Sequence, residues 1–553
     1  MSERYDVLYL HVPKFSSYYR PFDEYMFINY ISMGLFALAD LTERAGLRSR
    51  ILHLGVEWIA DRGFSILDYI EKTKPSVVAV PIFWHPQTYD AVEVIKAVKK
   101  RFPEIFVMSG GFTASYFGAE TMEFVPQIDA LVVGHGDRSV ADIAGRVVEC
   151  RRSTPALLDF SEKLDLSNIP NLLWRRGASR EIVTNAERYF PGRADLDSLN
   201  YSNMSLLSNL EIYSRSFRMN VAYSKRLTRE DNLRLTPIKA GHIPLFVGHG
   251  CPVECKLCAG RNLNQRRVNG SGEVVMRSPE KVCESIVEFK KYGFEQMVVC
   301  YDPFPGRPGY FLDLFRLIRE KNIETGMYFE SYGLPSPEFV EDFKATFPGD
   351  DSAIAISVES GSESVREKIR GYHFTDSELF ASLDHMQSRG VNFLVFFTIA
   401  NPFERASDLE KTAAMIARIK NDYGRARWIT TYPVQIEPGS AVFEAPERFG
   451  IEKTLFTFAD YYKFHGSAGS CLYTSLGYSI NDYFSDGLRG ATPADRVAEF
   501  SERISALRCE KFCVLHPDAS VGRAYCERFY EKYREMGFGS PDKVDKNGLV
   551  SAE

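Results

Sequence analysis

Two stretches of this 553-residue chain alternate apolar segments of strand length with amphipathic segments of helix length. In the first stretch, residues 1–145, the pattern predicts helices over 31–45, ending before Gly46, and over 89–101, together with strands over 5–10, 50–54, 76–81, 105–109 and 129–133. Continuous apolar strands separated by helices are typical of a doubly wound, Rossmann-like parallel sheet. Ligands of such sheets bind beyond the carboxyl ends of the strands.

The second stretch, residues 241–443, repeats the alternation. Its strands are predicted over 244–248, 296–301, 324–329, 353–359, 392–399 and 427–433. Ser278 and Pro279 are typical of a helix start. Thr375 and Glu378 have the spacing of a capping box, and Phe374 and Leu379 that of a hydrophobic staple. About six β/α units predict a partial TIM-type (β/α)6 barrel.

The pattern weakens elsewhere. Residues 146–240 are predicted to be a bridging segment packed on its neighbours, because Trp174, Tyr189 and Tyr213 need burial. Residues 444–553 are rich in aromatic side chains and are predicted to be an α-rich carboxyl-terminal region. The expected order is therefore a sheet domain (1–145), a bridge (146–240), a barrel (241–443) and a helical tail (444–553).

Composition excludes several classes of protein. The net charge of -6 gives no attraction to nucleic acid. The amino terminus lacks the apolar stretch of a signal peptide, and the longest apolar runs have strand length, too short to span a membrane. Ten cysteines in 553 residues are too sparse for a secreted disulfide scaffold. A cytoplasmic protein is expected.

The cysteines carry the most specific signal. Cys251, Cys255 and Cys258 lie in the sequence GCPVECKLCAG, with C-x3-C-x2-C spacing, directly after a predicted barrel strand. Three thiolates from one short loop can bind a cubane [4Fe-4S] cluster and leave its fourth iron open. A structural zinc site or an ordinary iron–sulfur site needs a fourth ligand, and the nearest cysteine, Cys283, lies in a predicted helix.

This loop, placed after the first strand of a β/α barrel, resembles the signature of the radical S-adenosylmethionine (SAM) superfamily. The resemblance implies that the cluster cleaves SAM reductively and yields a 5′-deoxyadenosyl radical, which abstracts a hydrogen from the substrate. It also implies SAM-binding residues at strand ends. Asp302 lies where the family holds the SAM amino group, although the family's Gly-Gly-Glu is absent. Ser357 and Glu359 resemble the SAM-binding strand, with an ion pair across the barrel mouth as the alternative for Glu359. Glu330 and Asn401 are assigned either to the substrate site or to rim hydrogen bonds.

The first domain resembles the cobalamin (B12)-binding domain of one radical SAM subgroup. The matching residues are Gly110, Gly111 and Thr113 after the fourth strand and Gly134 after the fifth. In that subgroup they approach the macrocycle, whereas the alternative is that they only form turns. The cobalamin motif Asp-x-His-x-x-Gly is absent, so no His is assigned to the lower cobalt face. His85 faces the cofactor or caps a loop.

The tail holds Cys509, Cys513 and Cys526, which are candidates for a second metal site, with buried free thiols as the alternative.

The subgroup resemblance predicts cobalamin-dependent methylation of an unactivated carbon. The alternative is cobalamin-independent radical carbon–carbon bond or ring formation on a lipid or natural product. A non-catalytic electron carrier is the third hypothesis, which the open iron disfavours. The expected cofactors are a [4Fe-4S] cluster, SAM and cobalamin. The expected partners are a small-molecule or lipid substrate and an electron donor such as flavodoxin or ferredoxin.

Overall fold

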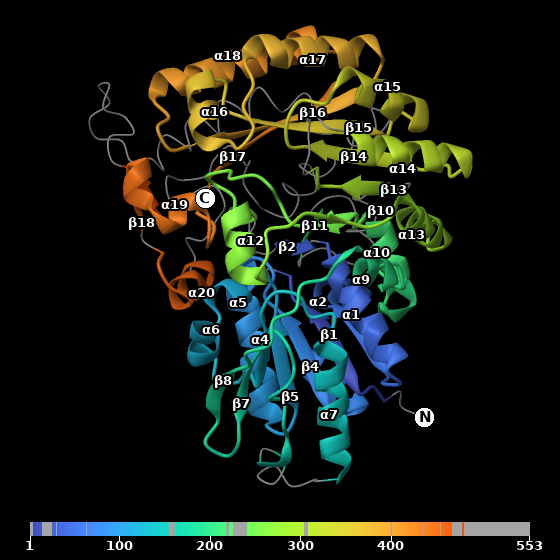
Figure 1. The fold of residues 1–553 in the computed structure, drawn as a ribbon, viewed down its shortest axis with the longest axis vertical. Coiled ribbons are helices and arrows are strands. Elements are labelled where there is room, and N and C mark those ends of the chain that lie inside the picture. The colour runs from blue at the N-terminus through green and yellow to red at the C-terminus, as the bar shows by residue number, and fades with distance from the viewer. Residues whose placement is uncertain are drawn as a thin grey trace, which may run out of the picture.

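A computed structural model describes residues 4–13, 25–28, 30–61, 63–153, 160, 162–216, 221–224, 241–302, 308–399, 401–434, 436–453, 455–466 and 478–480. Two mainly parallel β-sheets lie one above the other, with helix α12 (Asn262–Asn269) between them (Figure 1). The chain builds the lower sheet first and the upper sheet second, which agrees with the predicted order of the two α/β units.

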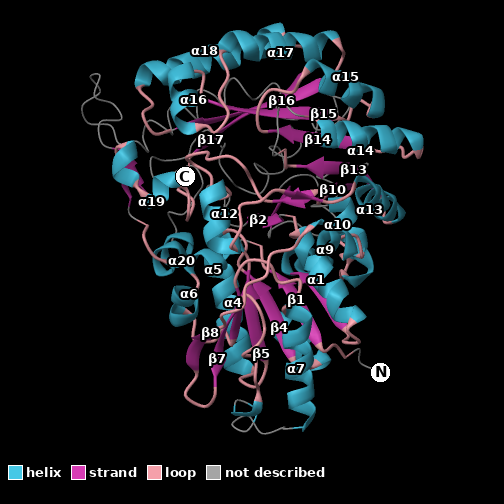
Figure 2. Ribbon diagram, in the orientation of Figure 1, coloured by secondary structure: helices cyan, strands magenta, loops and turns pink. Residues whose placement is uncertain are grey.

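The first sheet has the strand order β3-β1-β4-β5-β6-β7-β8. Its five parallel strands are those that the sequence predicts, and they are β1 (Val7–His11), β3 (Ser49–His53), β4 (Val77–Pro81), β5 (Phe106–Gly110) and β6 (Ala130–Val132). Its helices are α1 (Met33–Arg44), α2 (Leu54–Ala60), α3 (Ile66–Thr73), α4 (Thr88–Arg101), α5 (Phe112–Phe117), α6 (Ala119–Phe124) and α7 (Val140–Ser153). The predicted doubly wound sheet is confirmed, with helices on both faces (Figure 2).

A hairpin extends this sheet beyond the predicted strands. Strands β7 (Leu172–Arg176) and β8 (Glu181–Thr184) join its edge in antiparallel pairing. They lie in the stretch predicted to be a bridge, because the partly exposed β8 lacks the apolar run that identifies a buried strand. Trp174 of β7 is buried and donates to Asn185, which meets its expected need for burial.

The remaining elements of this stretch connect the two sheets. They are α9 (Arg193–Ser198), the 3-10 turn η2 (Met204–Leu206), α10 (Leu210–Ser216) and β9 (Val221–Ser224). Strand β9 pairs in antiparallel fashion with β2 (Tyr25–Ile28), which follows β1 in the first stretch of the chain. Helix α10 contacts both α2 and the first strand of the second sheet.

Six parallel strands form the second sheet in consecutive order. They are β10 (Gly241–Pro244), β13 (Phe294–Val299), β14 (Gly326–Ser331), β15 (Ala353–Glu359), β16 (Asn392–Ile399) and β17 (Ala426–Pro433). The intervening helices are α13 (Pro279–Lys291), α14 (Gly309–Glu320), α15 (Pro337–Thr346), α16 (Glu363–Ile369), α17 (Asp376–Ser388) and α18 (Ala406–Asp422). The predicted partial barrel is confirmed.

Local signals place several of these boundaries. Thr375 and Glu378 form the predicted capping box of α17, and Phe374 and Leu379 are buried as a staple requires. The first barrel strand, β10, ends at Pro244, whereas the prediction began this strand there, three residues too late. Proline has no N–H to donate to the hydrogen bonds between strands, which is why the strand ends at this residue. Residues 248–249 instead form β11 (Gly248–His249), which pairs with β12 (Val275–Met276).

After the barrel the chain returns to the first sheet. It forms α19 (Ala441–Glu444), the 3-10 turn η3 (Pro446–Phe449), β18 (Ile451–Lys453), α20 (Phe458–Gly466) and β19 (Tyr478–Ile480). Helix α20 packs against α4 and α6. Tyr462 donates to Glu93 over 2.6 Å, and the N–H of Phe458 donates to Glu120 over 2.5 Å. In the described part of the chain, no helix is both long and apolar enough to cross a membrane.

Candidate functional site

The three clustered cysteines lie in the loop between β11 and α12, close to the ends of the barrel strands. Gly250 precedes them with a φ of +87°, and a Cβ there would collide with the Glu273 carbonyl group. Tyr301, just beyond β13, donates its hydroxyl to the Gly250 carbonyl. Cys251, Cys255 and Cys258 are free thiols. The loop therefore begins at a position that requires glycine and is fixed to the neighbouring strand end.

Backbone N–H groups lie within hydrogen-bond distance of the cysteine sulfurs. The N–H of Gly260 lies 3.2 Å from Cys258 Sγ, and the N–H of Gly371 lies 3.2 Å from Cys255 Sγ. A Cβ at Gly371 would collide with Val253 and lie 3.1 Å from Cys255 Sγ. The loop thus packs directly on the turn that follows α16.

A second turn supports the other side of the loop. Glu437, just after β17, accepts the N–H of Ala259 over 2.7 Å, and Arg261 donates to the Gly439 carbonyl over 2.9 Å. Burial raises the pKa of Glu437. No short motif in the sequence links Glu437 to the cysteine loop, which it contacts across 178 residues.

Burial raises the pKa of all three thiols, and Glu437 contributes at Cys258, whose pKa lies well above the ordinary value. Iron must therefore displace a proton from each sulfur when it binds. Within the described ranges, no three His, Cys, Asp or Glu side chains converge on the position of a single metal ion. In a cubane each thiolate binds a different iron, so three free thiols on one loop, with backbone N–H donors beside them, fit the chemistry of such a cluster.

Strand β15 brings the next candidates to the same barrel mouth. Arg370 donates to the Ser357 carbonyl over 2.5 Å and to Glu359 Oε1 over 3.0 Å. Thr398 of β16 donates to Glu359 Oε2 over 2.9 Å. Glu359 has a φ of +70°, which is rare for a residue with a side chain. The ion pair named as the alternative for Glu359 is thus present, and it shares the carboxylate with a hydroxyl donor.

Three further candidates occupy different surroundings. Asp302, three residues beyond β13, is buried and accepts from Ser331 over 3.2 Å. Burial raises the pKa of Glu330, which makes hydrogen bonds with Cys300 and Ser357. Asn401 is fully buried, and its side chain donates to the Thr398 carbonyl over 3.0 Å. Glu330 is therefore directed toward barrel residues, whereas Asn401 takes part in rim hydrogen bonds.

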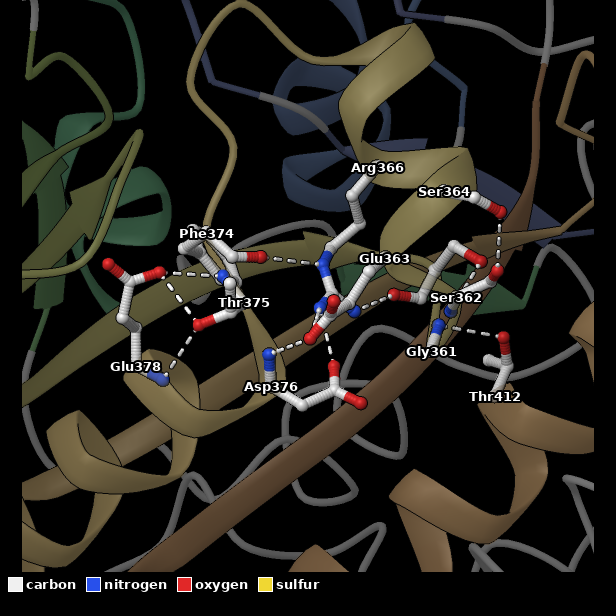
Figure 3. A network of polar contacts seen from close by, with 11 residues as sticks. Gly361, Ser362, Glu363, Ser364, Arg366, Phe374, Thr375, Asp376, Glu378 and Thr412 are labelled. Carbon is white, nitrogen blue, oxygen red and sulfur yellow. Dashed lines mark hydrogen bonds and ion pairs between the residues drawn. The ribbon is translucent and has the colours of Figure 1, made fainter.

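A buried arginine fixes the loops around Glu359. The Arg366 side chain, 0% exposed, donates to the carbonyls of Ser360 and Phe374 and pairs with Asp376 (Figure 3). The N–H of Gly361 donates to Thr412 in the same network. These contacts hold the chain on both sides of the turn that meets Cys255. No short motif in the sequence identifies Arg366, Arg370 or Gly371.

The first sheet presents glycines at its strand ends. Gly111 has a φ of +91°, and a Cβ there would lie 2.8 Å from the backbone of Ile82 and Phe83. A Cβ at Gly110 would lie 3.2 Å from the Val132 carbonyl oxygen, and one at Gly134 would lie 3.1 Å from that of Val268 in α12. Each of these glycines allows two backbone segments to approach closely, and the contact at Gly134 is between the first sheet and α12.

Aromatic side chains adjoin these glycines. Phe83 and Trp84, just after β4, are 51% and 46% exposed. Thr113 donates to the Phe83 carbonyl over 3.2 Å. Exposed aromatic groups beside close-packed backbone, at the carboxyl ends of parallel strands, fit a large flat ligand.

The His85 side chain contacts helix α20. Its Nδ1 lies 2.9 Å from Nε2 of His465 in α20, and its ring contacts Tyr461 edge-on.

Side chains from three parts of the chain meet where α12 touches the first sheet. Arg267 of α12 pairs with Glu444 of α19 over 2.8 Å and lies over the ring of Tyr116 of α5. Nearby, the rings of His135 and His249 lie 4.6 Å apart, so the loop after β6 contacts the strand that leads into the cysteines. The cysteine loop, which leads into α12, therefore lies between the carboxyl ends of the two sheets. Figure 1 shows α12 between the sheets.

Two family models match this chain: the B12 binding domain over residues 29–144 and the radical SAM superfamily over residues 245–416. The chain is a radical SAM enzyme with an amino-terminal B12-binding domain. The cysteine loop lies inside the second match, and the glycine-rich strand ends lie inside the first. The predicted family is confirmed, and its cofactors are SAM, a [4Fe-4S] cluster and cobalamin.

Relatives of this radical SAM enzyme are distant. An uncharacterized methyltransferase of Pyrococcus horikoshii is 23% identical over 66% of this chain and 70% of its own length. The hopanoid C-3 methylase of Methylococcus capsulatus is 23% identical over 35% of this chain and 39% of its own length. The radical S-adenosylmethionine methyltransferase TsrM of Kitasatospora setae, solved with tryptophan and a SAM analogue, is 14% identical with a TM-score of 0.60. That alignment covers 96% of this chain and 100% of TsrM. The likeness to TsrM shows a shared fold.

Cys509, Cys513 and Cys526 lie outside the described residues, so the predicted second metal site stays a prediction.

Proposed function

We propose that this radical SAM enzyme is a cobalamin-dependent methyltransferase that acts on an unactivated carbon of a small-molecule or lipid substrate. The observation that carries the proposal is the position of the cysteine loop. It lies between the barrel strand ends and the strand ends of the B12-binding domain, and α12 continues from the loop to Gly134. Two relatives named as a methyltransferase and a methylase support the same reaction class.

We assign Cys251, Cys255 and Cys258 as the cluster ligands. When bound, the cluster supplies an electron for SAM cleavage and cobalamin supplies methyl transfer. The N–H groups of Gly260 and Gly371 donate to two of the sulfurs, and Glu437 holds the loop backbone at Ala259. These contacts orient the thiolates before the iron binds.

Glu359, Ser357 and Asp302 are proposed to bind SAM. Glu359 is held in place by Arg370 and Thr398, so its carboxylate is oriented before a ligand arrives. Glu330 lies near the carboxyl end of β14, and burial raises the pKa of its carboxyl group. We propose that Glu330 contacts the substrate.

In the first domain we propose that Gly110, Gly111, Thr113 and Gly134 shape the cobalamin face. Phe83 and Trp84 would supply its apolar surface. An electron donor such as flavodoxin or ferredoxin and a location in the cytoplasm complete the proposal, and nucleic acid is not an expected partner.

The test is anaerobic purification followed by SAM turnover with and without cobalamin. The expected result is 5′-deoxyadenosine in both reactions and a methylated product only with cobalamin. Equal product in both reactions would favour the alternative, cobalamin-independent carbon–carbon bond or ring formation. Absence of SAM cleavage in the reduced, iron-loaded protein would contradict both.

A further inference from the structure

The turn that meets Cys255 also contacts the proposed SAM-binding strand. Gly371 donates its N–H to Cys255 Sγ over 3.2 Å, and the N–H of Lys256 donates back to the Ile369 carbonyl over 2.8 Å. Arg370, between these two contacts, pairs with Glu359 over 3.0 Å. One turn therefore joins a cluster ligand to a strand-end carboxylate.

Arg370 has little freedom to move. Its side chain is 6% exposed, and its guanidinium donates to the carbonyls of Ser357, Tyr332 and Tyr372 as well as to Glu359. The buried Arg366 fixes the chain before this turn, at Ser360, and after it, at Phe374. Figure 3 shows the contact with Phe374. The planar guanidinium fork of Arg370 thus holds the Glu359 carboxylate close to the backbone beside Cys255.

We propose that the Arg370–Gly371 turn is a positioning element that sets the reduction potential of the cluster and makes that potential respond to the charge at Glu359. The inference rests on the proposed assignment of Cys255 as a cluster ligand. Reduction adds a negative charge to the cluster. Hydrogen bonds to the ligand sulfurs and a nearby cation both favour the reduced form. The Glu359 carboxylate offsets the charge of Arg370, so a ligand that engages Glu359 changes how strongly Arg370 favours reduction.

The experiment is an EPR-monitored redox titration of the purified, iron-loaded protein without SAM. Arg370→Gln removes the cation and should disfavour reduction about tenfold, which moves the midpoint about 59 mV to more negative potential for one electron. Arg370→Lys keeps the charge and should stay closer to the wild-type potential. Lys368→Gln removes an exposed cation near the end of α16, just before the turn; it is the matched control and should leave the potential unchanged.

Glu359→Gln should shift the midpoint potential of the cluster in the opposite direction. Without the carboxylate the charge of Arg370 is no longer offset, so the midpoint should become more positive. In the double variant with Arg370→Gln this rise should be smaller, because only the direct effect of the lost carboxylate charge on the cluster remains. A protein that only needs Arg370 for folding would show no such dependence.

Equal potentials in the wild type, Arg370→Gln and Lys368→Gln would overturn the inference while leaving the proposed function intact. If Arg370→Gln fails to retain iron, Glu359→Gln decides alone, and an unchanged midpoint in that variant overturns the inference. A wild-type protein that binds no cluster would instead contradict the proposed function.

Discussion

The two parallel sheets present different chemistry at their carboxyl ends. At the first sheet the strand ends are glycines packed against neighbouring backbone, with Phe83 and Trp84 exposed beside them. At the second sheet the strand ends carry Glu330, Glu359 and the partner Arg370. Each end suits the ligand that its family match implies.

The difference teaches how one α/β architecture serves two cofactors. A large, flat macrocycle gains most from shape and apolar contact, which backbone and aromatic rings provide. A small charged ligand such as SAM gains most from fixed charges and hydrogen bonds. Substitutions that act on one sheet end and leave the other intact would test this division.

The largest loss of activity is expected from substitutions in the cysteine loop, which lies between the two sheet ends. Replacing Cys251, Cys255 and Cys258 by Ala should remove the cluster and all 5′-deoxyadenosine formation, because no thiolate remains to bind iron. Iron content and anaerobic product analysis measure this. Cys283→Ala is the control, since Cys283 is buried in α13 and should not affect iron. SAM cleavage in the triple variant would contradict the assignment.

A substitution at Gly111 should affect only the first sheet. The Cβ of Gly111→Ala would lie 2.8 Å from the backbone of Ile82 and Phe83, at a φ of +91°. We expect loss of cobalamin retention with an unchanged iron–sulfur spectrum, and a stability loss of about 1–3 kcal/mol from backbone strain. The bulkier Gly111→Trp should act in the same way.

Gly145→Ala provides the matched control for this comparison. It lies in α7 with no atom within 4 Å of the added Cβ, so it should stabilise the protein by about 0.5–1 kcal/mol. Cobalamin retention that is equal in the Gly111 and Gly145 variants would show that the loop assignment is wrong.

A substitution at Glu359 should affect only the second sheet. Glu359→Gln removes a charged hydrogen-bond partner, and such bonds contribute about 1.5–3 kcal/mol, so SAM should bind roughly 10–100-fold more weakly. Equilibrium binding of SAM to the iron-loaded protein measures this. Glu367→Gln, an exposed change on α16, is the control. If both variants bind SAM equally well, Glu359 has only a structural role.

The smallest effect, a loss of stability, is expected from a substitution at the contact between the two domains. Arg267→Ala removes an exposed pair with Glu444, and exposed pairs contribute about 0.2–1 kcal/mol. Denaturant unfolding at low and high salt should show a small loss that salt reduces. Arg266→Ala lacks the contact with another domain, because Arg266 bonds to Asn262 of its own helix, and it should change stability less. A larger loss at Arg266 would contradict this view of the junction.

The sequence predicts features whose residues lie close together in the chain, and it misses contacts between residues that lie far apart in the chain. The parallel strands, the capping box of α17 and the cysteine spacing are each written within a few residues. The supports of the cysteine loop are not, because Gly371 lies 116 residues from Cys255 and Glu437 lies 178 residues from Ala259. Their partners depend on how the barrel strands are ordered in space. A single sequence carries no local signal for that pairing.

The return of α20 to the first sheet also has a consequence for synthesis. Lys96 of α4 meets Tyr462 of α20 across 366 residues. At about 5–20 residues per second, a ribosome needs roughly 20–70 seconds to make that stretch. During this interval the surface of α4 and α6 that α20 later covers, which includes the rings of Tyr89 and Phe124, is accessible to chaperones and to other chains. The newly made first domain thus completes its packing only after the entire barrel has left the ribosome.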